Sequence, residues 1–185
     1  MSSVEELCYK EHCMCRMATL EDIPRLAEMF WNHLLTNPDY ISHGEIQMGV
    51  AAGVGVVAPE GDKKWKEYIT EKIIDSQGQV FIHEENQEIA GFIVVEISED
   101  GDKPFGVICD LIVNPAIRGK GLGSNLLNTG IGWLSEQGIT DFYLESGKNN
   151  HQAHAFFEHR GFSVISHIFK LKSNIPGEEK VKNEK

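Results

Sequence analysis

The stretch between residues 105 and 127 constrains the fold of this chain more than any other. Residues 105–113 are apolar and rich in β-branched side chains, which predicts a buried strand that ends at Asn114-Pro115. The turn that follows, residues 118–123, reads Arg-Gly-Lys-Gly-Leu-Gly and opens an apolar helix. Because glycines lack side chains, successive backbone N–H groups can approach an anion there, and the helix N-terminus adds the positive end of its dipole. The stretch therefore predicts a strand, a phosphate-binding turn and a helix.

Two better-known glycine loops do not fit this turn. The dinucleotide fingerprint G-x-G-x-x-G fails because no third glycine follows either glycine pair at the required distance. A Walker A loop needs a Gly-Lys pair followed by Ser or Thr, which the chain does not contain. Both results argue against a nucleotide-binding oxidoreductase. The acyl-CoA pattern R/Q-x-x-G-x-G/A does fit, through Arg118, Gly121 and Gly123.

A second block, residues 145–162, strengthens this interpretation. It is similar to the pattern N-x-x-A-x-x-F-Y-x-x-x-G-F, and the matching residues are Asn150, Ala153, Phe156, Gly161 and Phe162. With both motifs in order, the chain resembles the GNAT superfamily of N-acetyltransferases over roughly residues 79–169. The resemblance implies an α/β (α+β) fold of the GNAT type, in which helices flank a mixed, mostly antiparallel central sheet whose strands 4 and 5 splay apart.

The periodicity of the apolar residues agrees with the order of elements in such a fold. We expect strands at residues 13–17, 79–83, 88–97, 105–113, 142–146 and 162–169, and helices at residues 20–36, 62–75, 121–137 and 152–159. Residues 42–59 hold four glycines among apolar residues and fit no amphipathic template, so they are either a plain connector or a substrate-facing loop. Residues 1–172 form one predicted acyl-CoA N-acyltransferase domain, and residues 173–185 a polar, flexible tail.

The resemblance also implies acetyl-CoA as co-substrate and indicates which residues hold it. The pantetheine arm would lie between the splayed strands and pair with the main chain there, while the glycine turn holds the pyrophosphate. No metal is expected. The residues expected to contact acetyl-CoA are Leu111, Ile112, Val113, Arg118, Gly119, Lys120, Gly121, Leu122, Gly123, Ser124, Asn150 and Phe157.

Such an enzyme needs a base that removes a proton from the acceptor ammonium. By resemblance, Glu145 occupies the position of the base in ribosomal-protein alanine acetyltransferases, and Asp110 that of an acidic residue in polyamine acetyltransferases. Each is also compatible with a purely structural carboxylate, and Glu96 is a weaker third candidate. Strand alternation predicts which neighbours share the sheet face of Asp110. The same face is expected to hold Ile108 and Ile112, and the opposite face Cys109, Leu111 and Val113.

Protonation of the leaving group departs from the family pattern. Many members carry a tyrosine four residues before the Gly-Phe pair, but this chain has Phe157, which has no proton to give. His154 shares the helical side of Phe157 and is either a proton donor acting through water or a capping or packing side chain. His43 and Glu45 are expected to shape the acceptor pocket.

Composition narrows the possible partners. A net charge of −11 opposes nucleic-acid binding and favours a cationic acceptor. No apolar run is long enough for a membrane span and residues 1–10 lack a secretory pattern, so we expect a cytoplasmic protein with no membrane partner. The cysteines form neither a zinc nor a disulfide pattern, and a cluster of His12, Cys13 and Cys15 would need a distant fourth ligand to hold a metal. The four cysteines are Cys8, Cys13, Cys15 and Cys109.

The sequence therefore predicts an acetyl-CoA-dependent N-acetyltransferase, and it is compatible with a homodimer. It would pass the acetyl group to a primary amine of a small molecule or peptide by direct attack on the thioester. The alternative is an acyl-CoA binding or sensing module with weak or no catalysis, which Phe157 permits.

Overall fold

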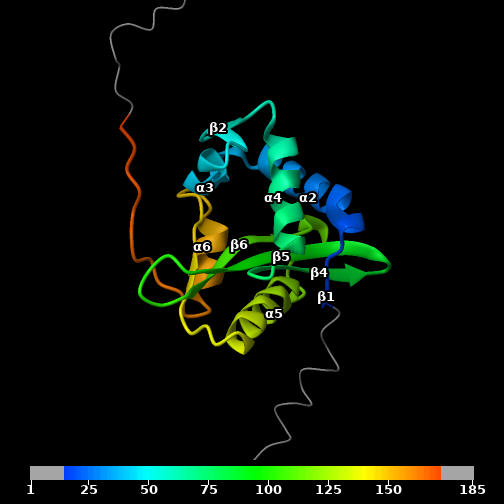
Figure 1. The fold of residues 1–185 in the computed structure, drawn as a ribbon. Coiled ribbons are helices and arrows are strands. Elements are labelled where there is room, and N and C mark those ends of the chain that lie inside the picture. The colour runs from blue at the N-terminus through cyan, green and yellow to red at the C-terminus, as the bar shows by residue number, and fades with distance from the viewer. Residues whose placement is uncertain (1–14, 172–185) are drawn as a thin grey trace, which may run out of the picture.

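The computed structural model describes residues 15–171, which form a five-stranded sheet with helices on both faces (Figure 1). In the sheet order β1-β4-β5-β6-β7, all neighbours are antiparallel except β6 and β7, which run parallel. This confirms the expected mixed, mostly antiparallel sheet. The strands are β1 (Cys15–Met17), β4 (Gly78–Glu85), β5 (Glu88–Ser98), β6 (Phe105–Val113) and β7 (Phe142–Leu144).

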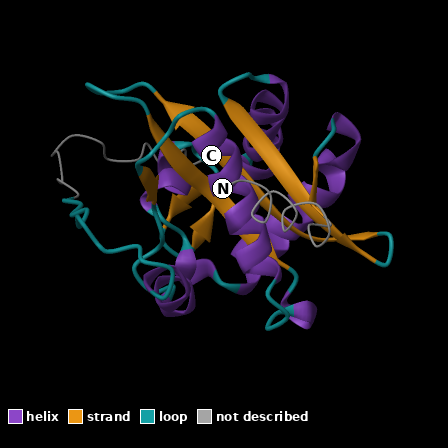
Figure 2. Cartoon of the chain, turned by 90° about the horizontal axis from the view of Figure 1, so that it is seen from below, coloured by secondary structure: helices purple, strands orange, loops and turns teal. Residues whose placement is uncertain are grey.

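Helices enclose the sheet from two sides, as Figures 1 and 2 show. On one face, α2 (Ile23–Thr36) and α4 (Gly61–Ile74) cover a core in which Phe30 stacks on Trp65 with ring centroids 4.5 Å apart. On the other face, α5 (Leu122–Glu136) covers a second core around Leu127. A large apolar side chain that is fully buried contributes about 1.5–3 kcal/mol, so these two cores fix the sheet between its helices. The last helix, α6 (His151–Glu158), follows β7.

Residues 42–59 are a packed part of the domain. The segment contains α3 (His43–Gln47) and a hairpin of β2 (Ala51–Gly53) and β3 (Val56–Val57), and it follows the 3-10 turn η2 (Pro38–Tyr40). Val50 is fully buried and Ala51 nearly so. From the sequence, these residues were either a plain connector or a substrate-facing loop. The structure does not support a plain connector, because it shows regular elements there.

Most other predicted elements are confirmed within a few residues. The β4–β5 hairpin turns at Asn86 and Gln87, whose φ values of 54° and 67° match a two-residue hairpin turn. The first predicted helix begins as a 3-10 turn, η1 (Leu20–Asp22), where the Asp22 carboxylate accepts the Thr19 N–H (2.7 Å). A second 3-10 turn, η3 (Pro115–Ile117), precedes the glycine turn. Cys8, His12, Cys13, the start of the first predicted strand and the predicted tail lie outside the described residues.

One predicted strand is wrong. Residues 162–169 have the apolar content of a strand, but the structure forms none there. A strand requires a neighbour that pairs with its backbone, and no backbone hydrogen bond joins residues 163–171 to the rest of the described chain. These residues stand off the body of the molecule after α6 (Figure 1).

Candidate active site

The sheet opens on the β7 side of β6. Pairing between the two parallel strands ends at Ile108 and Leu144, whereas β6 continues to Val113. On the other side, β6 pairs with β5 as far as Val113, and the N–H of Asn114 bonds to the carbonyl oxygen of Ala90 in β5 (2.9 Å). Since backbone groups of an antiparallel strand point alternately to either side, those of residues 111 and 113 face the β7 side. No strand in the described chain pairs with them there, which is the geometry expected between splayed strands.

A β-bulge in β6 changes which side chains accompany Asp110. The register pairs Val94 with Asp110 and Val95 with Ile108, so Cys109 is an extra residue without a partner on β5. Ile108 therefore packs in the α5-side core and Cys109 in the core beneath α2 and α4. The predicted faces of these two residues are wrong, because simple alternation does not hold across a bulge. The core clusters confirm the predicted separation of Ile112 from Leu111 and Val113.

Asp110 is held in an environment that suits proton transfer. Tyr68 of α4 donates a hydrogen bond to its carboxylate, so the side chain lies on the α2–α4 face. Burial, followed by the negative charge of Glu45, raises the pKa of Asp110 to about 7, and the hydrogen bond from Tyr68 acts in the opposite direction. Burial also raises the pKa of Tyr68, which stays a donor. A carboxyl group with this pKa can both take and give a proton near neutral pH.

Glu96, the third candidate base, is engaged in an ion pair. Its carboxylate contacts the ammonium of Lys72 on α4. Burial, followed by the charge of Glu96, raises the pKa of the neighbouring Cys109 thiol, which is therefore protonated at neutral pH. This cluster joins α4 to the sheet. The carboxylate of Glu96 is therefore not free, because Lys72 engages it.

Glu145 lies exposed just after β7 and contacts the N-terminus of α3. Its Oε1 accepts the N–H groups of His43 (2.6 Å) and Gly44 (3.2 Å), which a helix N-terminus leaves without internal partners. Two residues later, Gly147 approaches so closely that an added Cβ would lie 2.0 Å from the carbonyl oxygen of Tyr40. These contacts fix residues 40–44 over the end of β7. The role of Glu145 as a base stays a prediction.

His43 and Glu45, the two residues predicted to shape the acceptor pocket, both lie in α3 but make different contacts. Glu45 accepts the N–H of Ser42 (2.7 Å) and also its hydroxyl, which completes a capping arrangement. Its charge acts on Asp110, so α3 reaches the site through Glu45. His43 contributes its backbone N–H to Glu145.

The glycine turn before α5 is open. Gly119 and Gly121 adopt φ values of 85° and 84°, and no atom lies within 4 Å of a Cβ built at either position. Within the described chain, the N–H groups of residues 119–124 find no hydrogen-bond acceptor. They belong to the turn and to the first helical turn after the N-cap Gly121. This arrangement of free N–H groups, glycines and helix dipole fits a bound pyrophosphate.

The two predicted cations of the turn are both anchored. Arg118 donates from Nε to the carbonyl oxygen of Val113 (3.2 Å) and from Nη1 to Gln152 on α6 (3.3 Å). Lys120 forms an exposed ion pair with Glu85 at the end of β4 (3.2 Å). Arg118 thus ties the end of β6 to α6 beside the glycine turn.

A third cation at this turn was missed by sequence reasoning. The guanidinium carbon of Arg160 lies 3.6 Å from the centroid of the Phe156 ring, and its Nη2 donates to the hydroxyl of Ser124 in the first turn of α5. Its Nη1 holds the carbonyl oxygen of Phe156 (2.7 Å). Arg160 directly precedes the Gly-Phe pair of the second motif. This position was the only signal in the sequence by which Arg160 could have been identified.

Two predicted residues of α6 take part in local hydrogen bonds. The Oδ1 of Asn150 accepts the N–H of Ala153 (3.2 Å) and caps the helix. The Nε2 of His154 lies 3.1 Å from the carbonyl oxygen of Gly147, and since a carbonyl only accepts, this nitrogen carries the proton. His154 thus has the capping or packing role, which was one of its two predicted roles. Contacts of either residue with acetyl-CoA or its sulfur stay predictions.

Phe157 packs within an aromatic cluster at the end of α6. Its ring makes edge contacts with Phe156 (5.1 Å between centroids) and Phe162 (5.6 Å). All three join the core beneath α5. The side chain at the usual tyrosine position therefore stabilises the packing of α6.

Three general features of the described residues complete the site. Within residues 15–171, no group of three or more His, Cys, Asp or Glu side chains is arranged to hold a metal ion. The two cysteines in this range, Cys15 and Cys109, are not joined to each other by a disulfide. No helix in that same range has the length and apolar character needed to cross a membrane.

Known proteins with similar sequences are acetyltransferases. A mycothiol acetyltransferase of Propionibacterium freudenreichii is 34% identical over 94 residues, which are 50% of this chain and 30% of the relative. An uncharacterized N-acetyltransferase of Bacillus subtilis, YhfO, is 24% identical over 111 residues, covering 59% of this chain and 74% of that protein. The chain thus spans less than a third of the length of the first relative.

Solved structures share the fold. A predicted acetyltransferase of Clostridium acetobutylicum, determined with acetyl-CoA, superposes with a TM-score of 0.64 at 19% identity, over 85% of this chain and 94% of that one. An aminoglycoside 6'-N-acetyltransferase of Acinetobacter haemolyticus superposes with a TM-score of 0.65 at 12% identity, over 87% and 98%. At such identities the likeness concerns the fold alone.

The family model of the acetyltransferase (GNAT) family matches residues 55–162. This range contains β6, the glycine turn, α5 and the second motif up to Phe162. Because the match covers more than half of the sequence and includes the open side of β6, this chain belongs to the GNAT acetyltransferase family.

Proposed function

We propose that this chain transfers the acetyl group of acetyl-CoA to a primary amine of a small molecule or peptide, by direct attack of the amine on the thioester. Family membership supports acetyl transfer. The observation that carries the amine acceptor is Asp110, whose pKa is raised to about 7 on the strand that continues past β7. A carboxylate at this point can take the proton that an ammonium must lose before it attacks.

The chain offers three elements for holding the co-substrate, which supplies the acetyl group as an activated thioester. The backbone groups of Leu111 and Val113 on the open side of β6 can pair with the amides of the pantetheine arm. The free N–H groups of residues 119–124 can bind the pyrophosphate. Arg118 and Arg160 add positive charge on either side of this turn.

In the proposed reaction, Asp110 accepts a proton from the acceptor ammonium. The nitrogen lone pair freed in this way forms the new C–N bond to the acetyl carbon, and the electron pair of the C–S bond leaves on sulfur. The extra proton on nitrogen then passes to solvent or to the thiolate. Since Phe157 cannot donate a proton, the thiolate leaves without an acid at that position, which the low basicity of a thiol allows.

Glu145 has a positioning role in this proposal. Its Oε1 holds two N–H groups of α3, and α3 carries Glu45, whose charge acts on Asp110. The acidic residues Glu45 and Asp110 favour a cationic acceptor at this place. The mycothiol acetyltransferases match over only 30% of their length, so the proposal names the class of acceptor, a primary amine, and no single compound.

The test is acetyl-CoA-dependent release of CoA thiol with a panel of monoamines, diamines, amino sugars and peptides. We expect turnover with at least one amine, and a loss of about 100-fold or more in Asp110→Asn with acetyl-CoA binding unchanged by calorimetry. Asp100→Asn, an exposed carboxylate after β5, is the matched control and should keep full activity.

Wild-type turnover in Asp110→Asn would refute the assignment of the base. Tight binding of acetyl-CoA without turnover of any amine in the panel would instead indicate the binding or sensing module. Because the active form of Asp110 is ionised, kcat/KM is also expected to rise with pH through about 7.

A further inference from the structure

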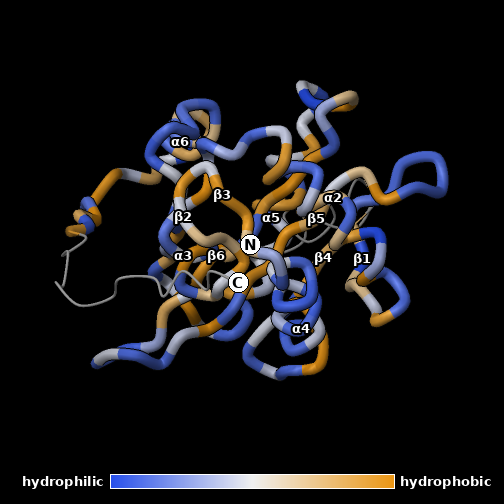
Figure 3. Tube along the Cα trace, turned by 90° about the horizontal axis from the view of Figure 1, so that it is seen from above, coloured by the Kyte–Doolittle hydropathy of each residue, from blue (hydrophilic) through white to orange (hydrophobic). Residues whose placement is uncertain are grey.

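The bulge in β6 turns two consecutive side chains toward the same helix. Regular alternation would place Cys109 and Asp110 on opposite faces of the sheet, but the extra residue in the register leaves both on the α2–α4 face. Figure 3 shows that α4, a helix on this face, carries hydrophilic and hydrophobic residues in turn. One of its polar groups, the hydroxyl of Tyr68, is hydrogen-bonded with both side chains of the bulge.

The hydroxyl of Tyr68 has one proton to donate and two neighbours that can accept it. Cys109 lies with its Sγ 3.8 Å from the carbonyl oxygen of Val107, to which the thiol donates its own proton. Toward Tyr68 the sulfur therefore acts as an acceptor, and a weak one. A carboxylate is a much stronger acceptor, so Tyr68 donates to Asp110 whenever Asp110 is ionised.

The hydrogen bonds rearrange when Asp110 takes up a proton. The new carboxyl O–H donates to the Oη of Tyr68, and the hydroxyl of Tyr68 turns its own proton to the Sγ of Cys109. Tyr68 and Cys109 each keep their proton in both arrangements, and only the proton taken from the acceptor ammonium is gained and later released. An enclosed carboxyl group without a partner in either state would be destabilised in that state.

We infer that Tyr68 is a positioning residue that keeps Asp110 hydrogen-bonded in both of its protonation states, with Cys109 as the alternate acceptor for the hydroxyl of Tyr68. The inference rests on the proposed function only in that Asp110 serves as the base there. A carboxyl group that changes its protonation state in every turnover then meets a partner each time, without any movement of α4. The bulge acquires a purpose, because it supplies the second acceptor.

The charged groups around this arrangement leave Tyr68 as the contact that favours the ionised base. Glu45 of α3 acts on Asp110 and disfavours its charge. Glu96 of β5 acts on Tyr68, but the ammonium of Lys72 contacts Glu96 and lies 5.5 Å from the centroid of the Tyr68 ring. The positive charge of Lys72 thus offsets that of Glu96. Removing the hydroxyl of Tyr68 should therefore make Asp110 harder to ionise.

The first test follows the carboxyl group itself, without turnover. Carbon-13 NMR of the full chain, labelled at the carboxyl carbon of aspartate side chains, gives the titration midpoint of each aspartate, and the signal missing in Asp110→Asn identifies Asp110. We expect a midpoint at about pH 7 in the wild type. In Tyr68→Phe the midpoint should rise by about one pH unit or more, because the ionised form loses its hydrogen bond.

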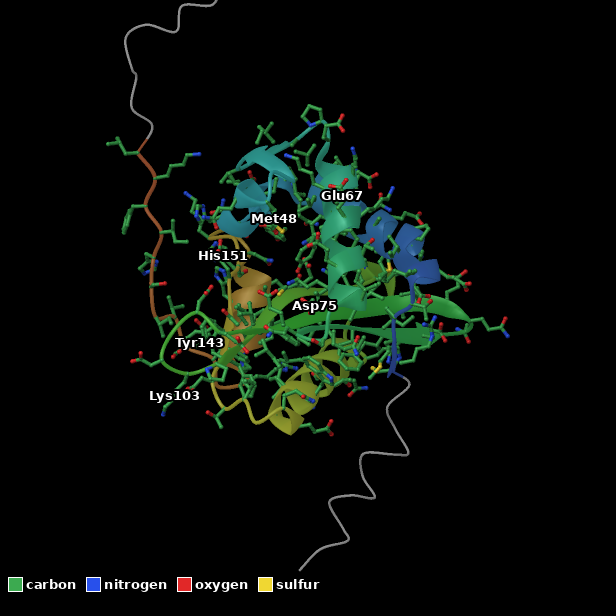
Figure 4. The ribbon with its side chains drawn as sticks, viewed as in Figure 1. Met48, Glu67, Asp75, Lys103, Tyr143 and His151 are labelled. Carbon is green, nitrogen blue, oxygen red and sulfur yellow. The ribbon has the colours of Figure 1, made fainter. Side chains whose placement is uncertain are left out.

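The matched control removes the same hydroxyl elsewhere. Tyr143, labelled in Figure 4, lies on β7 away from α4 and is 42% exposed. Tyr143→Phe should leave the midpoint of Asp110 unchanged. A midpoint that is unchanged or lowered in Tyr68→Phe would overturn the inference.

A second variant tests the alternate acceptor, and it does so even if Tyr68→Phe fails to fold. Cys109→Ala removes the sulfur that takes the proton of Tyr68 when Asp110 is protonated. The protonated form loses support, so the midpoint should fall by roughly a few tenths of a pH unit, opposite in sign to the shift in Tyr68→Phe. An unchanged or raised midpoint in Cys109→Ala would overturn the role of Cys109.

The last test is the pH dependence of kcat/KM with the best amine of the panel. In Tyr68→Phe the midpoint should move up with that of the carboxyl group, so activity at pH 7 falls about fivefold, while the plateau at high pH and the KM for acetyl-CoA stay within about twofold. A merely structural role would lower kcat/KM at every pH and leave the midpoint in place, which would refute a positioning role. If the NMR midpoint moves and the kinetic midpoint does not, the hydrogen bonds stand and Asp110 is not the base, so the two proposals can fail separately.

Discussion

Asp110→Asn is expected to stabilise the folded chain above neutral pH while it removes the proposed base. Burial raises the pKa of Asp110 from 3.8 to about 7, so the folded chain binds this proton more tightly than the unfolded chain does. The resulting stability is fully present below about pH 4 and is lost as the pH rises through about 7. Since a tenfold change in proton affinity corresponds to about 1.4 kcal/mol, the complete loss amounts to about 4 kcal/mol.

Asparagine has no charge to bury, and its oxygen can still accept the hydrogen bond from Tyr68. Urea unfolding of both proteins near pH 4 and near pH 8 measures the effect. We expect similar free energies of unfolding at the lower pH, and a variant more stable by about 2–4 kcal/mol at the higher pH. Asp100→Asn, whose carboxylate is exposed, should show no such pH-dependent difference. If Asp110→Asn were less stable at both pH values by the same amount, burial would not be what perturbs this carboxyl group.

Two further predictions concern the contacts around the site. Gly147→Ala places a Cβ 2.0 Å from the carbonyl oxygen of Tyr40, so urea unfolding should show a loss of about 1–3 kcal/mol, whereas Gly53→Ala, with nothing within 4 Å, should show little change. Equal effects of the two would contradict the close approach. Arg160→Ala should raise the KM for acetyl-CoA by about tenfold with kcat nearly unchanged, as measured by steady-state kinetics. Arg25→Ala, in a surface pair with Glu28, is its control, and an unchanged KM in Arg160→Ala would remove this residue from the binding site.

The elements with strong local signals could be predicted from the sequence. β6 begins and ends where its apolar run and Asn114-Pro115 indicate, and α5 begins beside Gly121, where the glycine turn indicates. Such boundaries depend on the conformational preferences of glycine, proline and β-branched residues, which act over a few residues. The mixed, mostly antiparallel sheet flanked by helices was expected from the resemblance that the two motifs carry, and the structure confirms it.

The errors lie where structure depends on a distant partner. The bulge at Cys109 is a property of the register between β5 and β6, and the run of side chains in β6 carries no sign of it. Residues 162–169 have the composition of a strand, but a strand also needs a neighbour that pairs with its backbone, and these residues pair with none in the structure. Arg160 was missed for a related reason, because its contact with Ser124 joins residues 36 positions apart.

The choice between the two predicted bases shows the same limit at the level of chemistry. From the sequence, both Asp110 and Glu145 were candidate bases near the thioester, since each matches a position used in a different group of relatives. Their surroundings separate them. The carboxylate of Glu145 is exposed and bonds to two main-chain N–H groups 101 and 102 residues away, so its removal should loosen α3. Asp110 is enclosed beside Tyr68 and Glu45, where burial disfavours its charge. The second environment suits a group that must take up and release a proton in each turnover, and for this reason we propose Asp110 for the proton transfer.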